Sequence, residues 1–270
     1  MTIKANFLTV ILMTVTVTLW SQGTGGGSLF YEKVRTLSID ERESAIVEEF
    51  KKGNYPSFMD TFCKITTKQK DVNGKTHRVT IFVSPNYLSI GNNEDFFIVP
   101  MSPKSAQQIA EMFNCSLPTP KVADIVYEHS QLKLEPFNFI PRGNRNETPD
   151  ILYDHSKIIQ AQIKAAGFPV TTLVSGIKKD IVISSKLADP KRDHHVTIYG
   201  WHKLDGKPIQ PLSNIHIEIY VDYSHGARLV SEKVIIDGKE HRYSDLLKDP
   251  LLYTLLSNEP NPLTKVSYMK

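Results

Sequence analysis

Histidine residues are concentrated in one part of this chain. Five of the nine histidines lie within the 32 residues from 194 to 225, where an even spread over 270 residues would place about one: His194, His195, His202, His216 and His225. Histidine changes charge near neutral pH, so it serves as a general acid or base and, when neutral, as a metal ligand. The stretch from Tyr199 to Val230 also carries carboxylates, lysine and arginine. We therefore take this stretch as the candidate site of chemistry.

The tripeptide Ser224-His225-Gly226 follows a segment, 215–222, that has the residue alternation of a β-strand. Glycine permits a tight turn, and polar side chains at a strand end are common components of sites built on rigid scaffolds. We expect His225 to act as a general base, Ser224 as a nucleophile, and Arg228 to bind a carboxylate or a developing negative charge. A general base, a nucleophile and an anion-binding group are typical of hydrolases and transferases.

Further residues of the same stretch complete two candidate sets. The candidate catalytic residues are His225, Ser224, His216 and His202. The candidate substrate-binding residues are Arg228, Lys203, Trp201, Tyr223 and Asp222. Lysine and arginine supply positive charge, and the aromatic rings supply apolar surfaces with polar edges.

Strand geometry limits how many of these residues can meet. Alternation along the predicted strand places His216 and Asp222 on a polar face, and Ile217, Ile219 and Val221 on a face that packs in the core. Six residues of straight strand span about 20 Å. His216 and Asp222 therefore cannot bind one ion together unless the strand bends.

A bound divalent metal that activates water is an alternative. The ligands would be His202, His216 and His225, and zinc suits such ligands. His194 and His195 are expected on opposite faces of their strand, so at most one of them could join a shared site. The chain has neither a His-Glu-x-x-His nor a His-x-His spacing. We therefore expect no cofactor, with zinc as the alternative.

The N-terminal half is predicted to combine helices with short strands. A charged amphipathic helix is expected within 38–56, strands at 77–84, 87–91 and 95–101, and helices from Ser102-Pro103, from Pro120 to His129 and over 151–167. Gly167 is expected to cap the last of these helices.

The C-terminal half is predicted to consist mainly of strands. They are expected at 171–176, 180–185, 194–200, 215–222 and 227–237, followed by helical segments at 243–247 and 250–258. Asp237-Gly238 favours a type I′ hairpin turn. The expected fold class is α+β, with helices in the N-terminal half and a mostly antiparallel sheet in the C-terminal half.

The N-terminus has the pattern of a secretory signal peptide. Lys4 precedes an apolar run over 7–20, and small, flexible residues follow. A membrane-spanning helix needs roughly 20 apolar residues, so we expect cleavage near residue 22 and no membrane anchor in the mature chain. The protein is expected to be secreted or periplasmic, with 23–270 forming one integrated α+β domain and a possible seam near 134–150.

Charge and cysteine content restrict the partners and the chemistry. The 32 basic and 29 acidic residues leave a net charge of +3, which does not favour nucleic acid as a partner. In an oxidising compartment the two cysteines, Cys63 and Cys115, are expected to form a disulfide. The alternative is that one of them is a nucleophile with partners distant in sequence.

Two resemblances add to this interpretation. The run Ser-His-Gly-Ala-Arg from Ser224 to Arg228 resembles the Ser-His-Gly-Cys-x-Arg motif of L,D-transpeptidases, secreted enzymes that act on peptidoglycan stem peptides, with His216 in the place of their upstream histidine. Ala227 stands where that family has its nucleophilic cysteine, so the cysteine mechanism does not transfer. Most of the chain also resembles a group of secreted bacterial proteins, and this resemblance implies no particular activity.

Three functions follow as hypotheses. The first is a secreted hydrolase or transferase that acts on a cell-envelope or extracellular polymer, peptidoglycan included, through the histidine-rich site. The second is a metal-dependent hydrolase. The third is a non-catalytic module that binds glycan or cell wall through Tyr199, Trp201, Tyr220 and Tyr223.

Overall fold

The computed structural model describes residues 25–141, 143 and 145–269. The predicted signal peptide, 1–22, lies outside the described residues. Helices and strands combine in a mixed α+β fold, as the sequence predicted. The described helices are α1 (Gly27–Val34), α2 (Ile39–Lys51), α3 (Pro103–Met112), α4 (Pro120–His129), α5 (Pro149–Ala166) and α6 (Tyr243–Leu246).

The larger sheet is built around one long strand. Strand β2 pairs with β1 over its whole length, and it also pairs with β12 and β13. The strands of this sheet are β1 (Cys63–Lys70), β2 (Thr76–Val83), β5 (Cys115–Ser116), β12 (Val230–Ser231), β13 (Lys233–Ile236) and β14 (Lys239–Arg242). Every pairing in it is antiparallel.

A second sheet carries the candidate site. Its strands, in spatial order, are β10 (Pro208–Ser213), β9 (Ile198–His202), β8 (Lys179–Ile181) and β11 (His225–Gly226). Strand β11 pairs with β8 in parallel, whereas the other pairings are antiparallel. Two small pairs complete the strands: β3 (Ser89–Gly91) with β4 (Phe96–Ile98), and β6 (Leu132–Lys133) with β7 (Val174–Ser175).

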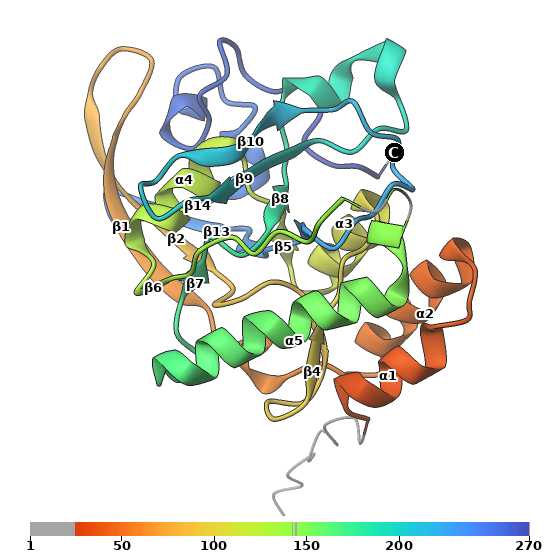
Figure 1. Cartoon of the computed structure of the whole chain (residues 1–270). Coiled ribbons are helices and arrows are strands. Elements are labelled where there is room, and N and C mark those ends of the chain that lie inside the picture. Colours follow the sequence, from red (N-terminus) through yellow and green to blue (C-terminus); the bar gives the residue numbers. More distant parts are fainter. Residues whose placement is uncertain (1–24, 142, 144, 270) are drawn as a thin grey trace, which may run out of the picture.

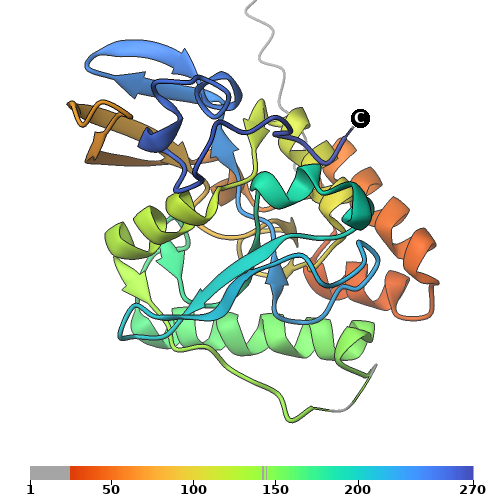
Figure 2. The same ribbon diagram turned by 90° about the horizontal axis from the view of Figure 1, so that it is seen from above.

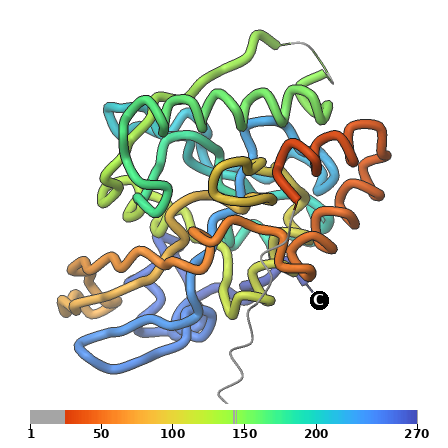
Figure 3. Tube along the Cα trace, turned by 90° about the horizontal axis from the view of Figure 1, so that it is seen from below, coloured from red at the N-terminus to blue at the C-terminus, as the bar shows by residue number. Residues whose placement is uncertain are grey.

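The helices and hairpins occupy different sides of the molecule. Helix α5 runs along one side, next to α1 and α2 at one end (Figure 1). Seen from above and from below, the β1–β2 and β13–β14 hairpins project side by side, away from α1 and α2 (Figures 2 and 3). In the described part of the chain, no helix is long and apolar enough to span a membrane.

A short run of chain joins the two sheets. The segment from His225 to Ile236 supplies β11 to the smaller sheet and β12 and β13 to the larger one. Between them, the carbonyls of Ala227 and Leu229 accept hydrogen bonds from the backbone N–H groups of Leu88 and Ser84. Ala227 and Leu229 are buried in the hydrophobic core. The candidate site is therefore attached to the centre of the fold.

Helix ends form where the sequence predicted them. Ser38 and Glu41 form a reciprocal capping box at the start of α2. Ser102 and Thr119 accept hydrogen bonds from backbone N–H groups in the first turns of α3 and α4, and each precedes a proline at the first helical position. Gly167 ends α5 with a left-handed φ of 71°.

The C-terminal hairpin turn is also confirmed. Asp237 and Gly238 connect β13 to β14 with φ values of 51° and 85°, and the type I′ turn requires positive φ at both positions. The strand predicted at 215–222 is wrong: this segment forms bends and a turn, with a single bridge between Ile217 and His195. The predicted core face is confirmed only at Val221, which is 1% exposed, because Ile217 and Ile219 are 51% and 48% exposed.

Other sequence predictions are also corrected. Helix α1 and strand β1 were not expected, and the expected helix at 250–258 is only a short 3-10 turn over Tyr253–Leu255. The predicted disulfide is absent: Cys63 and Cys115 are both free thiols. Burial raises the pKa of each thiol, to about 12 for Cys115, which does not favour a nucleophilic thiolate.

Gly226 lies where no larger residue fits. A Cβ atom built there would lie 2.6 Å from Tyr87 Cδ1 and 2.8 Å from Lys178 Cβ. Such distances are below van der Waals contact, so a side chain at this position must displace its neighbours. Glycine therefore lets β11 approach β8 closely enough to pair.

We predict that Gly226→Ala lowers the free energy of unfolding by about 1–3 kcal/mol, because it overpacks the core. Urea unfolding measures this loss. In a double-mutant cycle, we expect Gly226→Ala to lower the free energy of unfolding by less in the Tyr87→Ala background than in the native protein. Full additivity of the two substitutions would show that the Tyr87 ring is not the obstacle.

Candidate functional site

His225 is a buried histidine whose imidazole makes no hydrogen bond among the described residues. Its side chain is 1% exposed, and both ring nitrogens lack a partner. Its Nε2 atom lies 4.0 Å from Asp222 Oδ1, which is too far for a hydrogen bond. Burial lowers the pKa of His225 to about 4, although the nearby Asp222 carboxylate opposes the shift. The imidazole is therefore neutral at pH 7 and able to accept a proton.

Asp222 is held as a carboxylate beside this imidazole. Ser224 donates to Asp222 Oδ1 through its hydroxyl, at 2.5 Å, and through its backbone N–H, at 2.8 Å. Lys179 Nζ lies 3.6 Å from Oδ2. Burial acts to raise the pKa of Asp222, but His225, Lys179 and the Ser224 hydrogen bonds outweigh it and hold that pKa well below its usual range. Asp222 can therefore stabilise a positive charge on His225.

Two aromatic side chains cover His225. The Tyr220 ring packs edge-on against the imidazole, with ring centroids 5.9 Å apart. His216 stacks on Tyr220 at 4.2 Å, and burial lowers the pKa of His216. Both side chains are partly exposed. The imidazole is 1% exposed, so a substrate reaches it only after side chains that cover it have moved.

Lys178 lies close to the same cluster and is fully buried. Its Nζ donates to the Tyr223 carbonyl at 2.5 Å and to His155 Nδ1 at 3.1 Å. His155 Nε2 lies 3.2 Å from the Phe137 carbonyl, so the Nε2–H tautomer satisfies both contacts. Burial lowers the pKa of Lys178 to about 7, with Asp222 opposing the shift. Lys178 therefore exchanges a proton near neutral pH.

The parallel pairing of β8 with β11 brings these groups together. His225 is in register with Lys179, and Gly226 with Asp180. Sequence reasoning missed Lys178, Lys179 and Asp180, although three consecutive charged residues before a buried apolar run are an unusual start for a strand. It also missed His155, which helix α5 supplies.

Arg228 is a structural residue in this geometry. Its guanidinium donates to the carbonyls of Ser84, at 2.7 Å, and Val174, at 2.6 Å, and lies over the Tyr87 ring at 4.4 Å. The side chain is fully buried. A substrate-binding role for Arg228 therefore finds no support in these contacts.

The charge of Arg228 is balanced by a second buried carboxyl group. Tyr87 donates its hydroxyl to Asp180 Oδ2 at 3.2 Å, and Asp180 Oδ1 has no hydrogen-bond partner among the described residues. Burial raises the pKa of Asp180 to about 6, although Arg228, His202 and the Tyr87 hydroxyl oppose the shift. Asp180 thus titrates in a range in which carboxyl groups are normally ionised.

His202 and Lys203 lie at a different place. His202 Nε2 is 2.8 Å from Asp124 Oδ1, and its ring stacks on Tyr127 at 4.6 Å, where both side chains line a pocket of about 490 Å³ beside α4. Lys203 is exposed, and its carbonyl accepts the Tyr127 hydroxyl at 2.5 Å. The structure shows no direct contact of either residue with His225.

A break in strand alternation explains the position of His202. Trp201 has a left-handed φ of 57°, so its neighbours do not follow the two-residue period of a strand. Tyr199 and His202 both contact Asp124, while the Trp201 ring contacts Tyr223 and has Lys179 Nζ 5.3 Å above it.

The structure brings six of the nine predicted site residues into one cluster, which we call the His225 cluster. Its predicted members are Trp201, His216, Asp222, Tyr223, Ser224 and His225. In it, the Ser224 hydroxyl donates a hydrogen bond to Asp222, and it makes no hydrogen bond to the His225 ring. The order of contacts is therefore not that of a serine–histidine–aspartate triad.

The proposed metal ligands His202, His216 and His225 do not converge. Among 25–141, 143 and 145–269, no three His, Cys, Asp or Glu side chains are arranged to hold a metal ion. His202 is paired with Asp124, and His216 is stacked on Tyr220. These donor positions do not fit the predicted zinc site.

Comparisons with known proteins give no relative. No family model matches the chain, and neither a curated protein nor a solved structure is significantly similar to it.

We predict that Arg228→Met lowers the free energy of unfolding by about 3–5 kcal/mol, because it leaves two buried carbonyls and the Asp180 carboxyl group without their cation. Chemical denaturation measures the loss. Arg78→Met, at an exposed arginine, is the matched control and should change stability by less than about 1 kcal/mol.

The pKa values of His225 and Asp180 also predict a pH effect. Between pH 4 and 6.5 the unfolded chain protonates His225 and the folded chain does not, so this residue makes stability rise with pH. Between about pH 3.8 and 6 the folded chain protonates Asp180 and the unfolded chain does not, so stability falls with pH. The two contributions oppose each other over most of this range.

Asp180→Asn should remove the fall in stability with rising pH that Asp180 causes. We expect the variant's stability to rise with pH more steeply than that of the native protein, by up to about 1.4 kcal/mol per pH unit between pH 4 and 6. Urea unfolding at pH 4, 5 and 6 measures the slopes, and exposed Asp205→Asn is the control. Equal slopes in native protein and Asp180→Asn would contradict the assignment.

Proposed function

We propose that the protein is a hydrolase or transferase in which His225 is the general base. The observation that carries this proposal is a neutral imidazole with two unpartnered nitrogens, buried beside a carboxylate. Buried polar groups are nearly always hydrogen-bonded in folded proteins, so an unpaired buried imidazole is a costly feature to retain. Perturbed ionisable groups of this kind concentrate at active sites.

The reaction follows from the charges around His225. The imidazole removes a proton from water or from an acceptor hydroxyl group, and the resulting oxygen attacks the electrophilic carbon of the substrate. Asp222 stabilises the imidazolium that forms. The imidazolium then returns the proton to the leaving group as the substrate bond breaks. Exclusion of water by the Tyr220 ring strengthens these electrostatic interactions.

Two neighbours of His225 have supporting roles. Ser224 fixes the Asp222 carboxylate through two hydrogen bonds, and we assign it this positioning role instead of that of the nucleophile. Lys179 lies between Asp222 and the Trp201 ring, and it balances the carboxylate charge. The attacking group is therefore supplied from outside the chain.

We propose a cell-envelope or extracellular polymer as the substrate, with the protein secreted or periplasmic. The signal-like N-terminus and the resemblance of the run from Ser224 to Arg228 to the L,D-transpeptidase motif support this choice. Ala227 is buried in the core, so the position of that family's cysteine offers no functional group here. Peptidoglycan is the first polymer to test.

A binding role without catalysis has less support. Trp201 and Tyr223, two of its four proposed aromatic platforms, are buried and contact each other. Tyr199 donates its hydroxyl to Asp124, beside a separate pocket. These four rings therefore do not form one exposed surface.

The test is incubation of purified protein with bacterial sacculi, followed by mass spectrometry of released or altered fragments. We expect products from the native protein and a loss of at least about 100-fold in rate for His225→Ala, since general base catalysis contributes that much. His241→Ala, in β14, is the matched control and should retain full activity. Unchanged turnover in His225→Ala would overturn the proposed base.

The same assay gives a pH prediction. His225 must be neutral to act as a base, so its pKa of about 4 predicts that kcat/KM falls as pH drops below about 4. A pH–rate profile measures this acidic limb. A limb near pH 6.5, the value of an ordinary histidine, would instead assign the base to an exposed residue.

A further inference from the structure

A second set of cationic side chains lines a cavity of about 320 Å³ that is separate from the His225 imidazole. It lies between the start of α3, the turn that follows Pro190–Arg192, and the C-terminal segment. Its walls include Lys104, Arg192, His194, His195 and Lys265. We call it the Glu218 cavity, after the acidic residue that faces Lys104.

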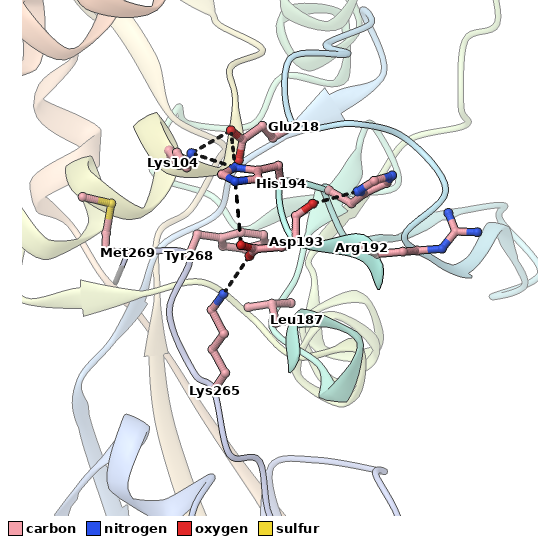
Figure 4. A pocket seen from close by; sticks show the side chains of 10 residues that line it. Lys104, Leu187, Arg192, Asp193, His194, Glu218, Lys265, Tyr268 and Met269 are labelled. Atoms are coloured by element: carbon pink, nitrogen blue, oxygen red, sulfur yellow. Dashed lines mark hydrogen bonds and ion pairs between the residues drawn. The ribbon is translucent and has the colours of Figure 1, made fainter. Parts of the chain in front are cut away.

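Two nitrogens in the Glu218 cavity converge on one carboxylate oxygen. Lys104 Nζ lies 2.6 Å from Glu218 Oε1, and His194 Nδ1 lies 3.2 Å from the same atom (Figure 4). The two nitrogens are 3.4 Å apart. A lysine and an imidazole directed at one oxygen form a site for a compact oxyanion, and Glu218 supplies that oxyanion from the chain itself.

The backbone at His194 is held in an unfavourable conformation. Its φ of 60° is left-handed, which costs free energy in a residue other than glycine. This conformation places His194 and His195 on the same cavity, although strand alternation would separate them. The prediction that the two point to opposite faces is therefore wrong, because β9 begins only at Ile198.

Apolar side chains also line the cavity. They are Leu187, Tyr268 and Met269, while Lys265 points toward Asp193, with 3.6 Å between Nζ and Oδ1 (Figure 4). The cavity therefore offers both cationic and apolar groups to a ligand. A ligand that matches it has an oxyanion attached to an apolar or ring-shaped group.

We propose that the Glu218 cavity binds an organic oxyanion, a carboxylate or a phosphate ester, which displaces Glu218 from Lys104 and His194. Lys104 and His194 remain 47% and 60% exposed while paired, so solvent and ligands can reach them. Glu218 is 18% exposed, so the pair is solvent-accessible from the Lys104 and His194 side, where a ligand anion can compete with Glu218.

Displacement of the Glu218 side chain affects Tyr220, which packs against His225, because Glu218 and Tyr220 belong to one short segment. Glu218 lies between His216 and Tyr220 in sequence, and its N–H donates to the His194 carbonyl at 2.8 Å. The Val196 N–H donates to the His216 carbonyl at 3.0 Å. Release of the Glu218 side chain leaves these backbone bonds in place but removes its contacts with Lys104 and His194, so the segment that carries Tyr220 is held by fewer interactions. This coupling rests on the proposed function, whereas the binding itself does not.

Benzoate and phenyl phosphate are suitable probes, with benzamide as the uncharged analogue of benzoate. Calorimetric titration at pH 7 and fixed ionic strength should show saturable one-to-one binding of at least one anion, and binding of benzamide at least tenfold weaker. Preference for benzoate or for phenyl phosphate identifies the carboxylate or the phosphate as the favoured group. Equal affinity for benzamide and benzoate would overturn an oxyanion site.

Variants assign the site to the named residues. Lys104→Met should weaken anion binding at least tenfold, and Glu218→Gln should strengthen it several-fold because it removes the internal competitor. Lys239→Met, in β14, is the control and should leave affinity unchanged. Circular dichroism checks that the variants are folded. Unchanged anion affinity in both Lys104→Met and Glu218→Gln would contradict the proposal.

Titration of the His225→Ala variant separates this proposal from the proposed function. Its anion affinity should equal that of the native protein, whether or not the native protein turns over a polymer. Native-like binding together with inactive native protein would leave the anion site standing and remove the His225 proposal. Absence of anion binding together with intact His225-dependent turnover would remove the anion site and leave the His225 proposal standing.

Discussion

A buried arginine lies on the run of chain that joins the two sheets, and the candidate site depends on it. The Arg228 guanidinium links its own crossing segment to the carbonyl after β2 and to the one in β7. A cation in this position requires a nearby anion, which Asp180 in β8 supplies beside Tyr87. The same short crossing begins with Ser224 and His225, so the catalytic imidazole that we propose is fixed by the core and not by a mobile loop.

Local signals predicted much of the fold. Ser102-Pro103 and Gly167 marked helix ends because capping depends on a few adjacent residues. Asp237-Gly238 marked its hairpin for the same reason. Pairings between distant strands carry no comparable local signal. The parallel contact of β11 with β8 joins residues more than 40 positions apart, and nothing near His225 in the sequence specifies it.

The candidate site was predictable only in part. The density of histidine drew attention to the chain around His225. Gly226 was expected to permit a tight turn, whereas it lies in β11 and allows close approach to Tyr87 and Lys178. The contacts of Arg228 do not support the substrate-binding role expected of it. In sequence, an arginine that donates to buried carbonyls cannot be told from one that binds substrate. Lys178 and His155 escaped notice because burial, which shifts their pKa values, is a property of the folded chain.

The exposed isoleucines between Asn214 and Tyr220 have a consequence for local stability. Ile215, Ile217 and Ile219 are already about half in contact with water, so detaching the segment 215–219 loses little buried apolar area from them. The cost of detachment is set mainly by polar contacts, among them the Lys104–Glu218 ion pair and the backbone bonds to His194 and Val196. Openings held only by such contacts have low free energies. Amide hydrogens of this segment therefore exchange with solvent faster than those of β2.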